Sequence, residues 1–309
     1  MPTLPGNSLS KLKIVETGTP LDRASGLGGL PRGFIVEFWG PSNTGKSTCA
    51  FQTVANAQSQ GLRCLWVDVE HSFRGYAANT ARSDAFGVDM DKLDVMVEAT
   101  AEEYIDNVIE AIKEKKYDLI VMDSVGDLSS KIEQDKTAAE KTIGVQASLM
   151  TKFVRSVVWM VDAYDVLFIA VNHERETLMG GIYQMGGKKL KEKKKMSFRF
   201  RDDKGTGSGL LSNGTRPDGT PLIVGKKIRI NVEKNHLAPT EGMEVKSNLF
   251  FQSGFDYVQD LFDMAVERNV ITREGNTFYF DGEKLGTNQK AREAIKDPDF
   301  AEKVRAAIG

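Results

Sequence analysis

The chain has 309 residues, of which 40% are hydrophobic and 27% are charged. This apolar fraction excludes a generally disordered chain, and the length suits two domains or one large domain with an appendage. The 41 basic and 43 acidic residues give a formal net charge of −2, which by itself argues against a nucleic-acid-binding protein. There is no membrane-spanning apolar run and no visible signal peptide, and two cysteines exclude a disulfide framework or a cysteine zinc site. We therefore expect a cytoplasmic protein with no membrane partner.

Short apolar runs predict five buried strands, at residues 34–40, 64–70, 117–124, 166–173 and 226–234. Their apolarity is continuous rather than alternating, which favours a parallel sheet covered on both faces. Helix formers follow the first run from Lys46 to Gln60. Apolar residues at helical spacing predict two further helices, one carrying Ile105, Val108, Ile109 and Ile112, and one over 145–164 carrying Leu149, Phe153, Val157 and Val161. This alternation of strands and helices predicts an α/β doubly wound core.

Two polar or glycine-rich stretches, at about 129–144 and 174–187, interrupt the alternation. Loops of this length inside a compact domain are usually functional or disordered. The composition changes near residue 254, where we expect a helix over 257–268, a hairpin and then a charged helix that ends at Ile308. The sequence thus predicts a short N-terminal arm and lead-in segment (1–32), a core (33–253) and a small α+β C-terminal domain (254–309).

Residues 40–47 form a complete G-x-x-x-x-G-K-S motif, a P-loop, between a predicted strand and a predicted helix. The glycines let backbone N–H groups wrap a phosphate, and the helix N-terminus adds a favourable dipole. We expect Lys46 to reach the β- and γ-phosphates and the Ser47 hydroxyl to ligate Mg²⁺. The predicted contacts to the nucleotide come from Gly40, Pro41, Ser42, Asn43, Thr44, Gly45, Lys46, Ser47 and Thr48.

Polar side chains close three of the predicted strands. Asp123, followed by Ser124, stands where a P-loop protein needs a second magnesium anchor. Hydrolysis also needs a group that orients or deprotonates the attacking water, and Glu70 and Asp68 compete for that role. We prefer Glu70 because it lies at the end of the strand, whereas Asp68 is one step deeper. His173 could contact the γ-phosphate, although a structural strand-end histidine is the simpler interpretation of the residues alone.

Taken together, these residues resemble the RecA recombinase family, and most closely its phage branch typified by UvsX. The resemblance covers nearly the whole chain in order, through GLGGLPRGFIVEFWGPSNTGKST, WVDVEH, IVMDSVGDL, AVNHERE, VEKNHLAP and GEKLGTNQKAREAIKDPDFAEKVR. It implies a RecA-like P-loop ATPase core with a mainly parallel sheet, with ATP and Mg²⁺ as ligands. It further implies a DNA recombinase that polymerises on single-stranded DNA, promotes homologous pairing and strand exchange with double-stranded DNA, and hydrolyses ATP in a DNA-dependent manner.

The same resemblance implies roles for individual residues and partners. Glu70 takes the position of the general base and His173 that of the γ-phosphate sensor. Lys234 lies where a neighbouring subunit supplies a cation to the γ-phosphate, and His236 lies where bacterial RecA proteins carry a second lysine. A loader and a single-strand-binding protein would be further partners, and a protein of phage origin would act in the cytoplasm of its bacterial host.

The two irregular stretches match the DNA-binding loops of the family. The residues this implies at DNA are Lys136, Lys141 and Ile143 in the first loop, and Arg175, Met179, Ile182 and Tyr183 in the second. The run 188–201 follows, beginning with Lys188 and Lys189, and holds eight cations against one acid. Charge runs are usually solvated faces, but beside a DNA loop this one predicts a stripe that follows the phosphates. The placement of charge thus reverses what the net charge suggested.

Two other functions stay open on the sequence. One is a hexameric DNA helicase on the same core, and the other is a non-catalytic, ATP-binding recombination mediator. The C-terminal appendage and the VEKNH strand favour the recombinase over the helicase, and an intact set of Lys46, Glu70 and Asp123 counts against the mediator. The sequence does not distinguish between a helical filament and a ring as the assembly that the protein forms. Tyr76 and Phe251 are candidates for stacking on adenine, with core packing equally open for both.

Overall fold

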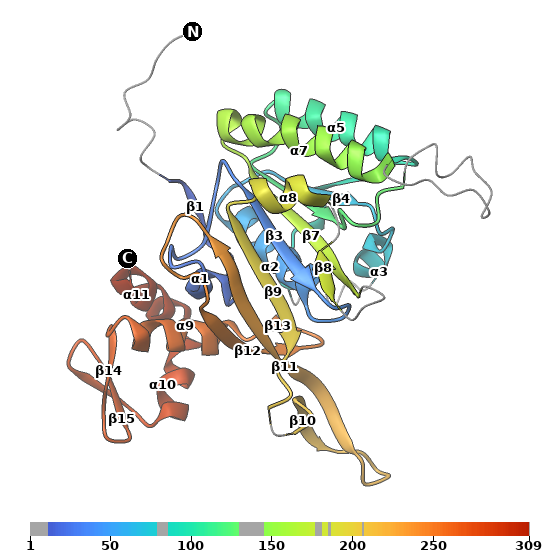
Figure 1. The fold of residues 1–309 in the computed structure, drawn as a ribbon. Helices are drawn as coiled ribbons and strands as arrows, with labels where there is room; N and C mark the ends of the chain where they lie inside the picture. The colour runs from blue at the N-terminus through green and yellow to red at the C-terminus, as the bar shows by residue number, and fades with distance from the viewer. Residues whose placement is uncertain are drawn as a thin grey trace.

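The computed structural model describes residues 12–78, 86–129, 145–176, 181–184, 187–205 and 207–308. Over these ranges the centre of the molecule is an eleven-stranded sheet (Figure 1). Nine strands follow the order β13-β12-β11-β9-β3-β7-β6-β4-β5, with β10 beside β11 and β8 beside β7. Their bounds are β3 Ile35–Gly40, β4 Cys64–Asp68, β5 Leu93–Met96, β6 Leu119–Asp123, β7 Leu167–Glu176, β8 Ile182–Gln184, β9 Met196–Asp202, β10 Leu210–Thr215, β11 Pro221–Asn235, β12 Glu244–Phe250 and β13 Gly254–Phe255.

The strands from β9 to β5 are parallel to one another, and this half of the sheet carries the P-loop. Four predicted strands are confirmed here as β3, β4, β6 and β7. The fifth, at 226–234, lies within β11, which is antiparallel to both β9 and β12. A parallel arrangement was therefore the wrong prediction for this strand. The turn of 236–243 between β11 and β12 is too short for the crossover that parallel neighbours require.

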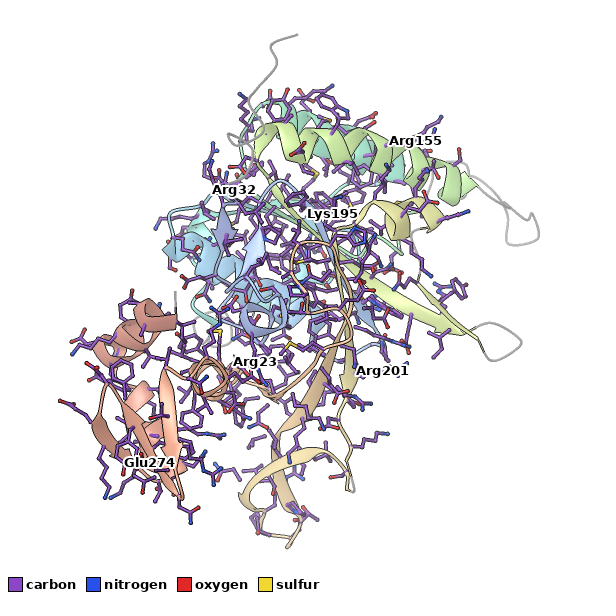
Figure 2. The ribbon with its side chains drawn as sticks, turned by 60° about the vertical axis from the view of Figure 1, so that its left-hand side comes forward. Arg23, Arg32, Arg155, Lys195, Arg201 and Glu274 are labelled. Carbon is purple, nitrogen blue, oxygen red and sulfur yellow. The ribbon has the colours of Figure 1, made fainter. Side chains whose placement is uncertain are left out.

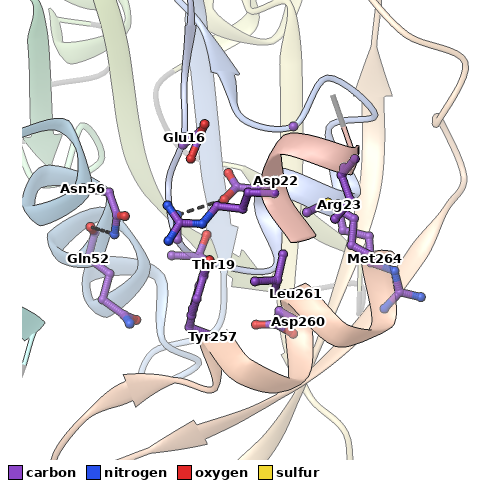
Figure 3. Close-up of a pocket in the computed structure, with 14 residues that line it drawn as sticks. Glu16, Thr19, Asp22, Arg23, Gln52, Asn56, Tyr257, Asp260, Leu261 and Met264 are labelled. Atoms are coloured by element: carbon purple, nitrogen blue, oxygen red, sulfur yellow. Dashed lines mark hydrogen bonds between the residues drawn. The ribbon is translucent and has the colours of Figure 1, made fainter. Parts of the chain in front are cut away.

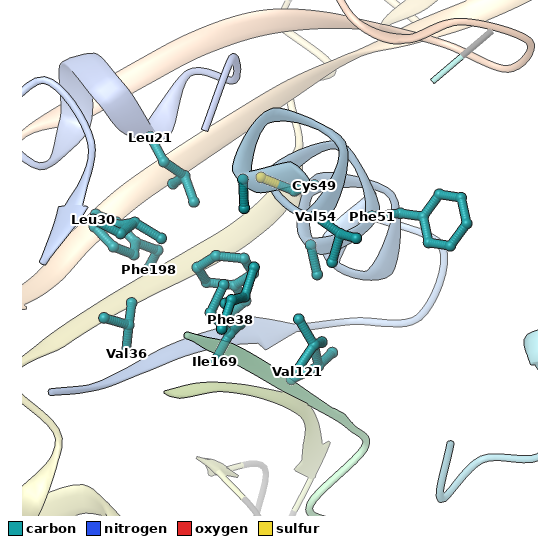
Figure 4. Packing of buried hydrophobic residues seen from close by; sticks show 14 of the residues in the cluster. Leu21, Leu30, Val36, Phe38, Cys49, Phe51, Val54, Val121, Ile169 and Phe198 are labelled. Atoms are coloured by element: carbon teal, nitrogen blue, oxygen red, sulfur yellow. The ribbon is translucent and has the colours of Figure 1, made fainter. Parts of the chain in front are cut away.

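Helices cover both faces of the sheet, as its continuous apolar strands require. On one face, α2 (Lys46–Ser59) packs on strand residues of β3, β6, β7 and β9, among them Phe38 and Phe198 (Figure 4). On the other face lie α5 (Ala101–Lys113) and α7 (Val145–Tyr164), and their predicted stripes are buried or partly buried there. A capping box formed by Thr100 and Glu103 fixes the start of α5.

Short elements complete the core. Residues 12–32 form a two-stranded antiparallel pair, β1 (Ile14–Val15) with β2 (Leu30–Pro31), around α1 (Leu21–Ala24), and they pack into the α2 side of the core. The segment after β4 contains α3 (Phe73–Ala78) and the 3₁₀-helix η2 (Met90–Lys92). Within the described part of the chain, no helix is long and apolar enough to cross a bilayer.

The C-terminal residues form their own small hydrophobic cluster, at the lower left of Figure 1. It contains α9 (Tyr257–Glu267), the antiparallel strands β14 (Ile271–Glu274), β15 (Thr277–Phe280) and β16 (Glu283–Gly286), and the helices α10 (Asn288–Ile295) and α11 (Pro298–Ile308). The single charged helix expected at the end is thus wrong, because two helices form. Pro298 begins α11, and the Asp297 side chain accepts a hydrogen bond from the Phe300 N–H at 2.9 Å.

A cavity of about 260 Å³ lies where these C-terminal helices meet α1 and α2 (Figure 3). Its lining includes Asp22, Asp260 and Tyr257, and none of the P-loop residues 40–47. Burial raises the pKa of Asp22 to about 7, although hydrogen bonds from Thr17 and Gly18 oppose the rise. The two buried carboxyl groups of this cavity, Asp22 and Asp260, therefore lie beside the C-terminal cluster and away from the P-loop.

The two predicted loops differ in outcome. Apart from Ser129, the first lies outside the described residues. In the second, β7 continues through Glu176 and pairs with β8, so the stretch from 174 is partly a β-hairpin rather than an irregular loop. The helix α8 (Gly187–Lys193) then leads back to β9 in the middle of the sheet.

Candidate nucleotide and DNA sites

The P-loop connects the end of β3 to the start of α2, and two of its glycines are required by geometry. Gly45 has a φ of 89° and precedes the first helical residue, Lys46. Gly40 has a φ of 141°, and a Cβ placed there would lie 2.2 Å from the backbone oxygen of Phe200. Glycine is therefore required at position 40 for the close approach of β9, and at position 45 for the left-handed backbone that leads into α2.

Lys46 is almost completely buried, and its Nζ donates a hydrogen bond of 2.7 Å to the carbonyl oxygen of Pro41. The Thr44 hydroxyl donates to the same oxygen at 2.8 Å. These two hydrogen bonds stabilise the conformation of the loop. Burial lowers the pKa of Lys46 to about 8, while the carboxylates of Asp123 and Glu70 work in the opposite direction. An ammonium so placed gains favourable interactions when an anion enters the loop.

Asp123 is fully buried at the end of β6, and neither of its carboxylate oxygens has a hydrogen-bond partner among the described residues. Burial raises its pKa to about 7, with Ser47 and Lys46 opposing that rise. An orphaned buried carboxylate beside a serine hydroxyl is an oxygen donor set that suits Mg²⁺. The residues present therefore fit the predicted magnesium site.

The competition between Glu70 and Asp68 has a geometric basis. The Asp68 carboxylate is buried and accepts hydrogen bonds of 3.0 Å from the backbone N–H groups of Ser72 and Phe73. The Glu70 side chain is 42% exposed, and its backbone N–H donates to the carbonyl oxygen of Asp123 at 3.0 Å. Asp68 thus stabilises the turn after β4, whereas Glu70 has a carboxylate available beside the predicted magnesium site.

His173 lies opposite Gly40 in the β3–β7 register, so the end of β7 adjoins the P-loop. Its Nε2 lies 3.9 Å from Oε1 of Glu70 and 3.7 Å from Oδ2 of Asp127. Burial and Lys46 lower the pKa of His173, while Asp127 and Glu70 work against this. Sequence reasoning missed Asp127, although a second carboxylate four residues after Asp123 was the available signal.

The two residues expected to act on a neighbouring subunit, Lys234 and His236, lie at the end of β11 and just beyond it. The buried Asn235 between them accepts hydrogen bonds from Leu237 and Ala238 and so fixes the turn. Lys234 donates to the carbonyl oxygens of Lys191 and Glu192, at 3.3 and 3.0 Å, at the C-terminal end of α8. This position complements the helix dipole. Lys234 therefore contacts α8 of its own chain, and His236 is exposed.

The candidate DNA residues are described only in part. Lys136, Lys141, Ile143 and Met179 lie outside the described residues. On the β7–β8 hairpin, Arg175 is exposed and pairs in register with Tyr183, and Ile182 and Tyr183 are 45% and 47% exposed. Exposed apolar and aromatic side chains of this kind suit contact with bases.

Four further candidates remain, of which three lie apart from the hairpin and the P-loop and one has a side chain outside the description. Lys188 and Lys189 lie on α8 and both approach Glu192. Phe251 is 45% exposed and lines a groove with β10 residues. The side chain of Tyr76 is outside the described part.

The prediction of a continuous cationic stripe over 188–201 is wrong for its second half. This half is β9, whose apolar residues Met196, Phe198 and Phe200 are fully buried. Lys194 is also buried, and Arg199 pairs with Glu174 at 2.9 Å. The guanidinium of Arg199 also stacks over the Trp39 ring. Lys195 and Arg201 lie toward opposite ends of this strand (Figure 2), so the solvated cations are mainly those of α8.

Comparisons with known proteins agree with this geometry. The family model of the RecA N-terminal domain matches residues 3–256. The chain is 29% identical over 311 residues to protein RecA of Methylobacterium sp. (strain 4-46), covering 98% of this chain and 81% of the relative. It is 31% identical over 305 residues to protein RecA of Cutibacterium acnes, covering 96% and 83%. For protein RecA of Bacteroides thetaiotaomicron the identity is 30% over 310 residues, covering 98% and 88%. The chain therefore belongs to the RecA family of DNA recombination and repair proteins.

Proposed function

We propose that this protein is an ATP-dependent DNA recombinase that polymerises on single-stranded DNA and promotes homologous pairing and strand exchange. One observation carries the proposal: β7 passes beside the P-loop at His173, and its end pairs with β8, which exposes Ile182 and Tyr183. Two paired strands thus join the nucleotide site to the candidate DNA contacts. Membership of the RecA family supports this combination of an ATP site with a DNA site.

In the nucleotide site, we assign each residue the role that its environment favours. The P-loop backbone and Lys46 would hold the phosphates, and Ser47 and Asp123 would hold Mg²⁺, which neutralises the charge on the phosphates when bound. Glu70 would orient and deprotonate the attacking water, since the Asp68 carboxylate is engaged by two backbone N–H groups. His173 would contact the γ-phosphate. Its closeness to Glu70 supports a role in which both respond to the same ligand.

Assembly would complete this site. Lys234 and His236 are proposed, from the family resemblance, to reach the nucleotide of a neighbouring protomer. In its own chain Lys234 donates hydrogen bonds to α8 and not to the P-loop. The division into an N-terminal segment (1–32), an ATPase core (33–253) and a C-terminal domain (254–309) is proposed with it, supported by the separate C-terminal cluster. Single- and double-stranded DNA and other copies of the chain would be the partners.

The finer branch of the family is also a proposal. The histidine at position 173 supports the phage UvsX-like branch, and the bacterial RecA relatives match at only 29–31% identity. On this assignment the protein would act in the cytoplasm of a bacterial host, with a loader and a single-strand-binding protein. An assay that adds these two proteins from a phage system tests the assignment, and failure of any such pair to increase strand exchange would contradict it.

Electron microscopy tests the central proposal. The protein is mixed with single-stranded DNA and a slowly hydrolysed ATP analogue, and its ATPase rate is measured with and without DNA. Helical filaments and a DNA-stimulated rate are the expected results. Rings would instead support a hexameric helicase, and absence of both assembly and hydrolysis would support an ATP-binding mediator.

A further inference from the structure

A set of mostly buried polar groups lies at β3, the strand that leads into the P-loop, and Lys194 is at its centre. The lysine is 2% exposed, and its ammonium forms an ion pair with Glu37 of β3. It also donates to Oε1 of Gln184 at 2.7 Å and to Oγ of Ser197 at 3.0 Å. An ammonium has three protons, and these three acceptors use all of them.

Glu37 is equally enclosed, with 1% of its surface exposed. It accepts hydrogen bonds from Oγ of Ser197 at 3.0 Å and from Nδ2 of Asn172 at 2.9 Å. The Oδ1 of Asn172 accepts in turn from the backbone N–H of His173 at 2.9 Å. The group therefore joins β3, three residues before the first P-loop glycine, to the residue beside the candidate γ-phosphate sensor.

Of the residues in this polar set, Gln184 is the one that does not lie in or next to the central strands of the sheet. It belongs to β8, which pairs only with the end of β7 in the described residues, where Gln184 lies opposite Glu174. The two residues before it, Ile182 and Tyr183, are the exposed candidates for DNA contact. Its amide oxygen therefore attaches a projecting hairpin to a fixed, fully paired charge in the core.

We propose that Lys194 is a positioning residue, and that its hydrogen bond to Gln184 couples DNA at the β7–β8 hairpin to ATP hydrolysis at the P-loop. The inference rests on the proposed function. A hairpin that shifts on DNA must either retain this bond and move Lys194 with Glu37, or break it and leave one ammonium proton unpaired. Both responses would alter β3 just before the P-loop, so this hydrogen bond gives the hairpin and the nucleotide site a direct physical connection.

Changing Lys194 itself risks unfolding, so the test uses Gln184→Met and, as its matched control, Gln184→Glu, which keeps an acceptor. The measurements are ATPase rates with and without a single-stranded oligothymidylate, the KM for ATP, DNA affinity by fluorescence anisotropy, and the melting temperature. For Gln184→Met we expect an unchanged basal rate, KM and DNA affinity, with DNA stimulation reduced about fivefold. Its melting temperature should fall modestly, because one proton of the buried Lys194 ammonium loses its acceptor. Gln184→Glu should retain the stimulation.

The outcomes separate the two levels of inference. Normal stimulation of Gln184→Met, equal loss in both variants, or stimulation restored by saturating DNA would overturn the coupling alone. If DNA fails to stimulate the unaltered protein, the proposed function falls and the coupling falls with it. A basal rate or DNA affinity lowered in parallel with stimulation would also overturn the positioning role, because a general loss of folded protein would then explain the defect.

Discussion

The imidazole Nε2 of His173 lies 3.7 Å from Oδ2 of Asp127. Both residues lie at the carboxyl ends of the central strands, where β3 leads into the P-loop. The same carboxylate oxygen accepts a hydrogen bond from the hydroxyl of Ser124, next to the candidate magnesium ligand Asp123. Asp127 thus lies between the candidate magnesium site and the candidate γ-phosphate sensor.

Asp127→Asn should lower the pKa of His173 further. Burial and Lys46 already lower it, and Asp127 is one of two carboxylates that oppose this effect. Loss of its negative charge therefore favours the neutral imidazole, so His173 becomes protonated only at a lower pH than in the unaltered protein. The chain has three histidines, which makes an NMR titration of the imidazole signals practical. Asp91→Asn, on η2, is the control, and an unchanged titration of His173 in Asp127→Asn would contradict the prediction.

Glu70→Gln should reduce the kcat of ATP hydrolysis by about 10²–10⁴-fold while ATP binding persists, as expected for loss of a general base. Asp68→Asn is the matched control two residues away. It weakens the hydrogen bonds to Ser72 and Phe73 and should cost about 1 kcal/mol of unfolding free energy with little effect on kcat. Steady-state kinetics and thermal unfolding distinguish the two. The assignment fails if the Asp68 variant is the inactive one.

The cations of α8 give a prediction about salt. Lys188, Lys191 and Lys193 are exposed, and each replacement by glutamine should reduce the salt slope of single-stranded DNA binding by about 0.7 if that lysine contacts a phosphate. Lys303→Gln, on the exposed face of α11, should leave the slope unchanged. Anisotropy titrations at several salt concentrations measure the effect. A triple variant with the normal slope would remove α8 from the DNA site.

Lys194→Met should destabilise the protein by about 3–5 kcal/mol, since it leaves the Glu37 carboxylate buried without its ion-pair partner. Urea denaturation measures this loss. The double variant Glu37→Gln with Lys194→Met removes both charges and should recover a large part of it. If the double variant is as unstable as the sum of its single variants, the ion pair is not the source of the effect.

Sequence patterns were sufficient to predict the elements whose residues are set by one physical requirement. The P-loop strand and helix, Asp123 and the stripes of α5 and α7 follow from the glycine motif and from 3.6-residue periodicity, and the fold agrees with them. The antiparallel part of the sheet was harder to predict from the sequence, because β10, β11 and β12 are half-exposed strands with mixed polarity. Their pairing depends on distant partners rather than on local composition.

The charge of a segment was the least reliable predictor of whether that segment is exposed. The residues 194–201 read as a basic run, yet Met196, Phe198 and Phe200 alternate with polar residues, a strand signal that the lysines obscured. The partners that neutralise this run, Glu37 and Glu174, lie on β3 and β7. Ion pairs between residues far apart in the sequence cannot be predicted from the local sequence, so the burial of Lys194 could be recognised only in the folded chain.

Asp260→Asn should make the stability of the protein less sensitive to pH. Asp260 is buried in the cavity between α9 and the core, and burial raises its pKa well above its ordinary value (Figure 3). A raised folded-state pKa means that the stabilising contribution is complete at acid pH, below the unfolded pKa, and is lost as pH rises through the folded value. Asparagine retains an acceptor for the Ser247 hydroxyl, 3.0 Å from the carboxylate, but cannot ionise.

The unfolding free energy of Asp260→Asn, relative to the unaltered protein, should therefore increase between pH 5 and 8, by at most about 1.4 kcal/mol per pH unit. Asp22 titrates in the same cavity with a pKa raised to about 7, but it is present in both proteins and its contribution largely cancels. Urea denaturation at a series of pH values measures the difference, with Asp299→Asn on α11 as the exposed control. A difference that stays constant with pH would mean that Asp260 has the same pKa in the folded and unfolded chains, and that its burial is offset by hydrogen bonding alone.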